Sequence, residues 1–280
     1  MRECCEVSLS AFTVDASTLT GGPEWLVARR ATAAERFAAT PLPTAEEEVW
    51  RYSRIGDLAL DRYTPTATVT EVTHGELGRV RVGRTSELEG AEALLGALPP
   101  TADALTWLHH ALVADPLVID VPAGVTLAEP IVVRHTGPGD GALAAVRLVV
   151  RAGADSDVRI VEVFDGGGAG LLLPITDIAL AGSARVGYVG AQLLDRATWS
   201  IGTVDIDADA QATVTAGLAG FGGDYARTRT NCRLNGRGAS GTLLAAYFGD
   251  GDQTLDYRTF QEHVAPDTTS NLLFKAVVSD

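Results

Sequence analysis

Three side chains in the second half of this 280-residue chain have the types that metal and group-transfer chemistry uses: Cys232, His263 and Lys275. A thiolate is a soft metal ligand and a nucleophile, and an imidazole binds metals and moves protons. In "RTRTNCRLNG" the alternation of side chains places Cys232 on the face opposite the arginines, which predicts an inward-pointing thiol. We therefore expect these three residues on the inner wall of a β-structure.

Each of these residues also has a purely structural interpretation. A free cysteine is commonly a small buried hydrophobic residue, so Cys232 fits a core position without any chemistry. His263 is in phase with alternate residues of its strand and fits a hydrogen-bonded core histidine. An unpaired lysine is costly to bury, so Lys275 needs either a function or a buried carboxylate partner. The sequence leaves these alternatives open.

The remaining thiols and the paired histidines are weaker candidates for metal binding. Cys4 and Cys5 are predicted to be incidental thiols near a frayed terminus rather than ligands completed by a partner. Three cysteines are too few for a disulfide framework or a closed four-thiolate site. His109 and His110 point about 100° apart around a helix axis and cannot bind one ion together. We expect them at the surface or partly buried.

Several functional classes are excluded by missing motifs and by charge. The chain has no G-x-x-x-x-G-K-[ST] loop and its only lysine follows Phe274, so it is not an ATPase itself. It also lacks the G-x-S-x-G segment of many hydrolases. A net charge of -14 argues against nucleic acid as a partner, and no apolar run approaches the roughly 18 residues of a membrane helix. Because "MRECCEVSLS" lacks the apolar core of a signal peptide, the sequence predicts a cytoplasmic protein.

An internal repeat predicts the architecture that must position these residues. Short apolar strands run into tight turns every 27 to 29 residues along the chain. The turns lie at Ala123-Gly124, Ala152-Gly153, Ala181-Gly182, Ala208-Asp209 and Asn235-Gly236. A fixed period in this range, without helical crossovers, indicates a mainly β fold with a right-handed parallel β-helix, that is, a β-solenoid. A β-sandwich is the structural alternative.

The N-terminal part is predicted to be helical and to lead into the solenoid through a mixed segment. An amphipathic helix is expected from Pro23 to about Ala39, and Thr44 with Glu47 forms a capping box for a second short helix over 46–55. The predicted organisation is a helical region over 1–56, a mixed connecting segment over 57–114 and the β-helix core over 115–280.

Two sequence patterns, and in addition the segment around Cys232, resemble a known family. The C-terminal stretch resembles the D-x-x-T-x-x-x-H-x-A-P-x-T-x-S-x-x-x-x-K run of the SufB/SufD proteins of iron–sulfur cluster assembly. Its matching residues are Asp256, Thr259, His263, Ala265, Pro266, Thr268, Ser270 and Lys275. The string "EEEVWRYSRI" resembles the E-E-x-W-R-Y motif near the start of SufD-type chains, and the segment around Cys232 resembles one in SufB-type chains whose cysteine serves sulfur delivery or cluster assembly.

The resemblance implies a non-catalytic scaffold subunit of the SUF system, most similar to SufD. Such a subunit pairs with a SufB-type paralogue, and each of the two binds a SufC-type ATPase. A cluster would form transiently at the partner interface, because clusters usually need four thiolates and this chain offers one internal thiol. Some complexes of the family also bind a reduced flavin. Family members continue past this sequence, so we expect the usual SufC contact region to be missing here.

A second functional class remains open on the residues alone. Carbohydrate-active β-helices gather aspartates and arginines on one outer face. This chain has Asp205, Asp207, Arg227, Arg229 and Arg233 in such an arrangement. A carbohydrate-active or adhesive β-helix is therefore the alternative to the scaffold.

Overall fold

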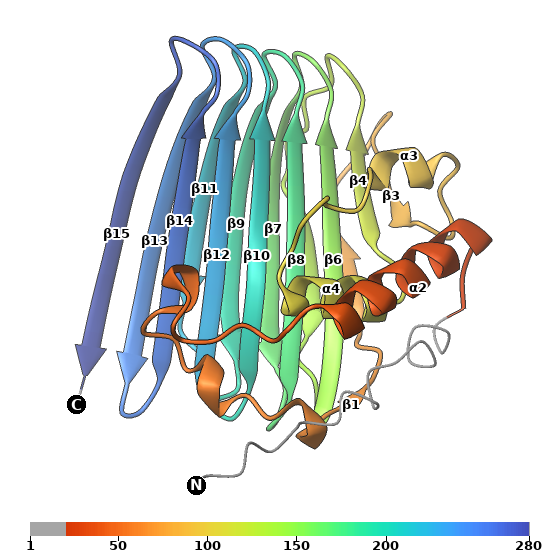
Figure 1. Cartoon of the computed structure of the whole chain (residues 1–280). Helices are drawn as coiled ribbons and strands as arrows, with labels where there is room; N and C mark the ends of the chain where they lie inside the picture. Colours follow the sequence, from red (N-terminus) through yellow and green to blue (C-terminus); the bar gives the residue numbers. More distant parts are fainter. Residues whose placement is uncertain (1–20, 280) are drawn as a thin grey trace, which may run out of the picture.

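A computed structural model describes residues 21–279 and shows a mainly β protein built as a parallel β-solenoid (Figure 1). From β4 onward, successive strands alternate between two sheets, here called sheet A and sheet B, so that each strand pairs with the strand two positions further along the chain. This topology confirms the predicted solenoid. It rules out the β-sandwich, because neighbouring strands come from successive coils and run parallel.

The two sheets contain all the strands of the described chain. Sheet A comprises β3 (Arg81–Arg84), β4 (Leu117–Val121), β6 (Ala142–Ala152), β8 (Leu171–Leu180), β10 (Trp199–Ala208), β12 (Tyr225–Leu234) and β14 (Thr254–His263), with β1 (Thr64–Pro65) paired to β6. Sheet B comprises β2 (Thr70–Thr73), β5 (Ile131–Thr136), β7 (Asp157–Gly166), β9 (Arg185–Leu194), β11 (Thr213–Gly220), β13 (Ser240–Asp250) and β15 (Thr269–Ser279).

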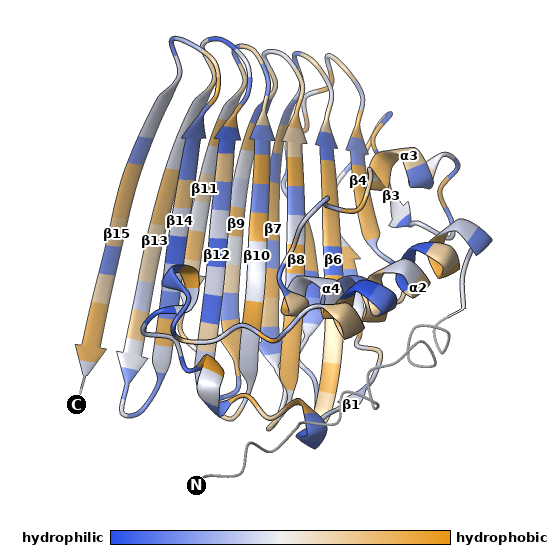
Figure 2. Cartoon of the chain, in the orientation of Figure 1, coloured by the Kyte–Doolittle hydropathy of each residue, from blue (hydrophilic) through white to orange (hydrophobic). Residues whose placement is uncertain are grey.

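Strict alternation of side chains builds the core between the sheets. Apolar and polar residues alternate along most strands, which Figure 2 shows as changing bands of hydropathy. Because the register is unbroken, inward residues of successive coils stack into ladders. One ladder runs through Ile119, Val150, Ile178, Ile206 and Cys232, each at most 1% exposed.

The turns that join sheet A to sheet B stack on one another, as the repeat predicts. Asp155, Ser183 and Gln211 occupy equivalent places in successive coils, and each has a φ of 58°. Coils also approach closely beside these residues. A Cβ added to Gly236 would lie 1.9 Å from the backbone nitrogen of Ala210 in the coil before it.

Replacing Gly236 by alanine should therefore push two coils apart. We expect Gly236→Ala to lower the free energy of unfolding by about 1–3 kcal/mol in urea denaturation, the usual cost of overpacking. Gly249→Ala is the matched control, because the nearest atom to its new Cβ lies at 3.9 Å. Equal stability of the two variants would contradict the close stacking of the coils.

Helices cover one part of the outer face of sheet A. α2 (Glu24–Ala39) packs along α4 (Ala104–Leu112), and α4 lies on β6 and β8 (Figure 1). α2 agrees with the predicted first helix. His109 and His110, expected at or near the surface, are only 1% and 4% exposed, because α4 is enclosed between α2 and the sheet.

The predicted second helix over 46–55 is wrong. The chain forms only short 3₁₀ turns, η2 (Glu48–Trp50) and η3 (Ile55–Asp57). Half of the capping box is present, since the backbone nitrogen of Thr44 donates to the Glu47 carboxylate at 2.9 Å. The helix does not continue because distant arginines hydrogen-bond the carbonyl groups that further helical turns would use.

The segment between the helical region and the solenoid joins the first coil. β2 and β3 pair antiparallel with β5 and β4, and so they cover the edge where the parallel ladders begin. Short helices complete this layer: η4 (Leu60–Arg62) and α3 (Ala91–Leu95). Among residues 21–279, no helix is long and apolar enough to cross a membrane.

Candidate functional site: the inner wall and the motif junction

Cys232 lies on the inner wall of the solenoid, as predicted. It belongs to β12, packs in the apolar core and is 1% exposed. Burial raises the pKa of its thiol to about 11, and the negative charge of Asp207 acts in the same direction. Near neutral pH the isolated chain therefore carries a protonated thiol at this position, which is a poor nucleophile and a poor metal ligand.

This environment predicts slow alkylation of Cys232. In a Cys4→Ser/Cys5→Ser background, iodoacetamide at pH 8 should label the folded chain far more slowly than the chain in urea, because both the thiolate and access to it are suppressed. Mass spectrometry of the alkylated protein measures the two rates. Similar rates in the folded and unfolded chain would contradict the buried, protonated thiol.

His263 and Lys275 are not brought together with Cys232. His263 aligns with Leu234 on the inner face but is exposed in the described coils, where its ring nitrogens contact the hydroxyls of Thr268 and Ser270 at 2.7 and 2.9 Å. Lys275 is exposed on the outer face of sheet B, because the neighbouring Phe274 is the residue that packs against the core. The expected inner-wall position of Lys275 is therefore corrected, and the roles of all three residues stay predictions.

A buried polar network lies deeper in the solenoid and was missed from the sequence. The carboxylate of Glu162 in β7 contacts the Nε2 of His135 at 2.9 Å and accepts hydrogen bonds from Thr176 at 2.6 Å and Tyr188 at 2.7 Å. All four side chains are at most 2% exposed. Burial and the adjacent carboxylate raise the pKa of Tyr188 well above its usual value, so the phenol remains a hydrogen-bond donor. The available signal was a glutamate in the inward phase of β7, whose other inward residues are Val158, Ile160 and Phe164.

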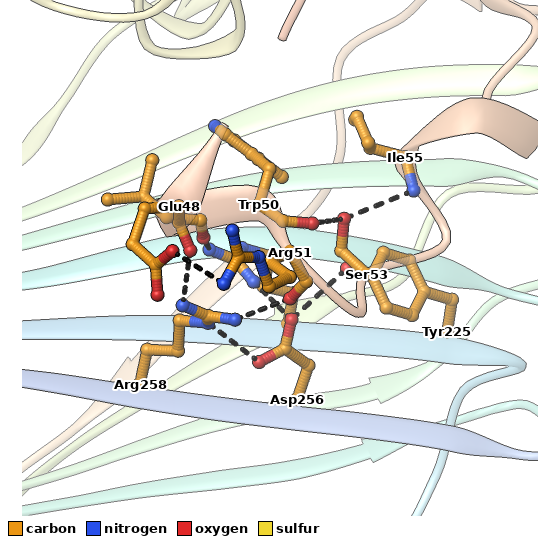
Figure 3. Close-up of polar contacts among 10 residues, drawn as sticks. Glu48, Trp50, Arg51, Ser53, Ile55, Tyr225, Asp256 and Arg258 are labelled. Carbon is orange, nitrogen blue, oxygen red and sulfur yellow. Dashed lines mark hydrogen bonds and ion pairs between the residues drawn. The ribbon is translucent and has the colours of Figure 1, made fainter. Parts of the chain in front are cut away.

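The two sequence patterns that resemble the family meet on the outer face of sheet A, at a contact that we call the motif junction. It consists of residues 48–53 together with Arg227, Asp256 and Arg258 (Figure 3). The guanidinium of Arg227 lies 4.2 Å from the ring centre of Trp50, donates to the carbonyl of Val49 and pairs with the Asp256 carboxylate. Arg258 donates to the carbonyls of Glu48, at 2.9 Å, and Arg51.

The motif junction gives Arg227 and Asp256 a structural role. Arg227 is 3% exposed, so its charge needs the Asp256 partner that the D-x-x-T pattern supplies. Burial raises the pKa of the neighbouring Tyr225 to about 12, and its hydroxyl lies 3.4 Å from the same carboxylate. The arrangement clamps residues 48–53 onto β12 and β14.

The outer-face charges that suggested a carbohydrate-active protein are largely used within the protein. Arg233 makes two 2.7 Å hydrogen bonds to Asp207. Burial alone would raise the pKa of Asp207, but these bonds and the charge of Arg233 hold it below its usual value. Asp205 accepts a 2.7 Å hydrogen bond from Asn231. Within the described part of the chain, no group of three or more His, Cys, Asp or Glu residues could hold a metal ion; Cys4 and Cys5 lie outside it.

Comparison with known proteins supplies the family. The family model described as "SUF system FeS cluster assembly, SufBD core domain" matches residues 134–280, a range that begins within β5. The chain belongs to the SufBD family. The SufBD core thus contains Cys232, the Glu162 network and the sheet side of the motif junction.

Curated relatives agree with this assignment. The chain is 27% identical over 253 residues to "Iron-sulfur cluster assembly SufBD family protein Rv1462" of Mycobacterium tuberculosis (strain ATCC 25618 / H37Rv). It is 24% identical over 245 residues to the SufBD family protein ML0594 of Mycobacterium leprae (strain TN). Each alignment covers 86% of this chain and 60% of the relative, so the chain spans about three fifths of the length of these relatives.

Proposed function

We propose that this chain is a SufD-like scaffold subunit of iron–sulfur cluster assembly, which pairs with a SufB-type subunit and works with a SufC-type ATPase. The observation that carries the proposal is the SufBD core match over the solenoid coils from residue 134 onward. The chain's own chemistry is consistent with a supporting role. Its described residues offer one thiol, Cys232, whose raised pKa of about 11 keeps it protonated, whereas a cluster usually needs four thiolates.

A SufD-like rather than SufB-like role is favoured by two features of the chain. The sequence contains only three cysteines, and it carries the "EEEVWRY" pattern at residues 46–52. That pattern is fixed to β12 and β14 by Arg227 and Arg258, so it is an integral part of the fold rather than a loose extension. In this proposal the cluster is cargo assembled with residues of the partner subunit.

The reduced flavin implied by the resemblance is proposed for the complex and not for this chain alone. Gly137, Gly139 and Gly141 lie in the connection from β5 to β6, and Gly167 and Gly168 follow Gly166, the last residue of β7. Within the described chain, a strand and not a helix follows each segment, so no helix N-terminus is placed to receive a pyrophosphate. The residues present therefore do not fit a dinucleotide cradle. We expect flavin absorbance in the purified complex and not in the isolated chain.

Cluster yield tests the proposed function. The SufB-type and SufC-type partners would be expressed with and without this chain, and iron and acid-labile sulfide would be measured per mole of SufB-type subunit. We expect a higher yield with the chain present. Unchanged yield would overturn the proposal. Cys232→Ser, a nearly isosteric change in the core, distinguishes a chemical role of the thiol from the scaffold role of the chain. A loss of cluster yield in this variant would assign chemistry to Cys232. A normal yield would make Cys232 a packing residue.

A further inference from the structure

A cleft outside the SufBD inner wall lies between α4 and the outer face of sheet A. Its volume is about 460 Å³, within the range of small-molecule pockets of roughly 300–1,000 Å³. The floor is formed by one rung of the sheet, in which Arg147, Ile175, Thr203 and Arg229 are aligned across four strands. Thr106 and His110 of α4 form one wall, and residues 97–103 form the rim.

Two buried nitrogens of residues that line this cleft have no hydrogen-bond partner among the described residues. Arg147 is 5% exposed, and its Nε donates to Asp177 at 2.8 Å, yet its Nη1 has no hydrogen-bond partner among residues 21–279. The same holds for the Nδ1 of His110, which is 4% exposed. An unsatisfied buried polar group costs about 1–3 kcal/mol, and more when it is charged. Both residues line the cleft, so an acceptor bound there could satisfy these nitrogens after a small side-chain shift.

A third unpaired nitrogen adds positive charge beside the cleft. Arg29 of α2 donates through Nη1 to the carbonyl of Gly96, next to the rim, while no described residue accepts a hydrogen bond from its Nη2. Burial and the charge of Arg147 together lower the pKa of Arg29 to about 10. Burial, together with these arginines, also lowers the pKa of His110 well below its usual value, so the imidazole is neutral. A bound anion would relieve this repulsion.

The carboxylates that line the cleft do not pair with Arg147 Nη1 or His110 Nδ1. Asp177 is engaged by the Nε of Arg147, and Asp103 caps α4 by accepting from the backbone nitrogen of Thr106 at 2.8 Å. Asp205 accepts from Asn231 at 2.7 Å and lies 3.8 Å from Arg233, and its burial raises its pKa. Arg229 also lines the cleft, but its guanidinium is engaged: the Nε donates to Asn231 at 2.8 Å, and the group lies 4.7 Å from the ring centre of Phe260.

We propose that this cleft binds a small oxyanion, a carboxylate or phosphate group, with Arg147 Nη1 and His110 Nδ1 as the buried donors. The planar guanidinium matches the two oxygens of such a group, and the neutral imidazole donates when its proton resides on Nδ1. The ligand is a small molecule, because the cleft is bounded by α4, the rim and the sheet. The site is separate from the proposed scaffold function, so either can fail alone.

Calorimetric titration with two probes, inorganic phosphate and citrate at constant ionic strength, tests the site and separates phosphoryl from carboxylate ligands. We expect at least one probe to bind with a dissociation constant below about 10 mM. Arg147→Gln/Asp177→Asn removes the donor without orphaning the carboxylate and should weaken binding at least about tenfold. Arg237→Gln, at an exposed ion pair with Asp267, should leave it unchanged.

A second variant keeps the test decisive if the double variant fails to fold. His110→Phe preserves the bulk of the buried ring and removes one donor, so it should weaken binding by about two- to tenfold. Failure of both probes to bind the wild-type chain would overturn the proposal. Binding that is equally strong in the wild type and in either cleft variant would place the anion elsewhere and would also overturn it.

Discussion

Replacing Arg227 by methionine should lower the free energy of unfolding by about 3–5 kcal/mol, the cost of breaking a buried ion pair from one side. Methionine keeps much of the volume of the arginine stem but removes the charge. The partly buried carboxylate of Asp256 would lose its closest cation, the carbonyl of Val49 its donor, and Trp50 the guanidinium stacked on it. Urea denaturation followed by circular dichroism measures the loss.

The matched control is Arg196→Met, at an ion pair with Asp250 in which both side chains are exposed. Such pairs contribute about 0–1 kcal/mol, so this variant should behave nearly as wild type. Limited proteolysis adds a local readout, because the junction variant should be cleaved faster within residues 44–55. Equal stability of Arg227→Met and the control would contradict the motif junction as a clamp.

Removing the carboxylate of Glu162 should be about as damaging, with an expected loss of roughly 3–5 kcal/mol for Glu162→Ala. The substitution would leave the hydroxyls of Thr176 and Tyr188 and the imidazole of His135 buried without their shared partner. It would also open a cavity between the sheets. The midpoint of urea denaturation should fall accordingly.

Glu71→Ala provides the comparison, since Glu71 is an exposed residue of β2 and its loss should cost less than about 0.5 kcal/mol. Tyr188→Phe is the gentler probe, because it removes a single donor to Glu162 and retains the ring. We expect it to cost about 1 kcal/mol. If Glu162→Ala were as stable as Glu71→Ala, the network would not be the fully bonded core unit that its geometry describes.

Local patterns were sufficient for much of the fold. The turn repeat predicts the coils because each coil is built from the same local unit, two strands joined by a tight turn. Strand alternation also predicts the inward side of Cys232, because its neighbours Asn231 and Arg233 are polar and its ladder partner Ile206 is apolar. The same alternation, applied at Phe274, would have placed Lys275 outside; the family pattern led to the inner wall instead.

Long-range contacts account for what the sequence did not predict. The helix expected over 46–55 is replaced by 3₁₀ turns because Arg227 and Arg258 donate hydrogen bonds to backbone carbonyls of this segment. These arginines lie about 180 to 210 residues later in the chain. Glu162 takes its partners from neighbouring strands of both sheets, so no local spacing indicates the network. The cleft at Arg147 likewise depends on α4 folding back over the sheet.

Complex formation is the strongest test of the proposed scaffold role. The chain would be co-expressed with a SufB-type subunit and a SufC-type ATPase, and the purified material analysed by size-exclusion chromatography with light scattering. We expect a single species whose mass includes this chain and a SufB-type subunit. The control variant Arg237→Gln, changed at an exposed ion pair, should form the same complex. Elution of the chain apart from both partners, with its fold intact by circular dichroism, would contradict the scaffold role.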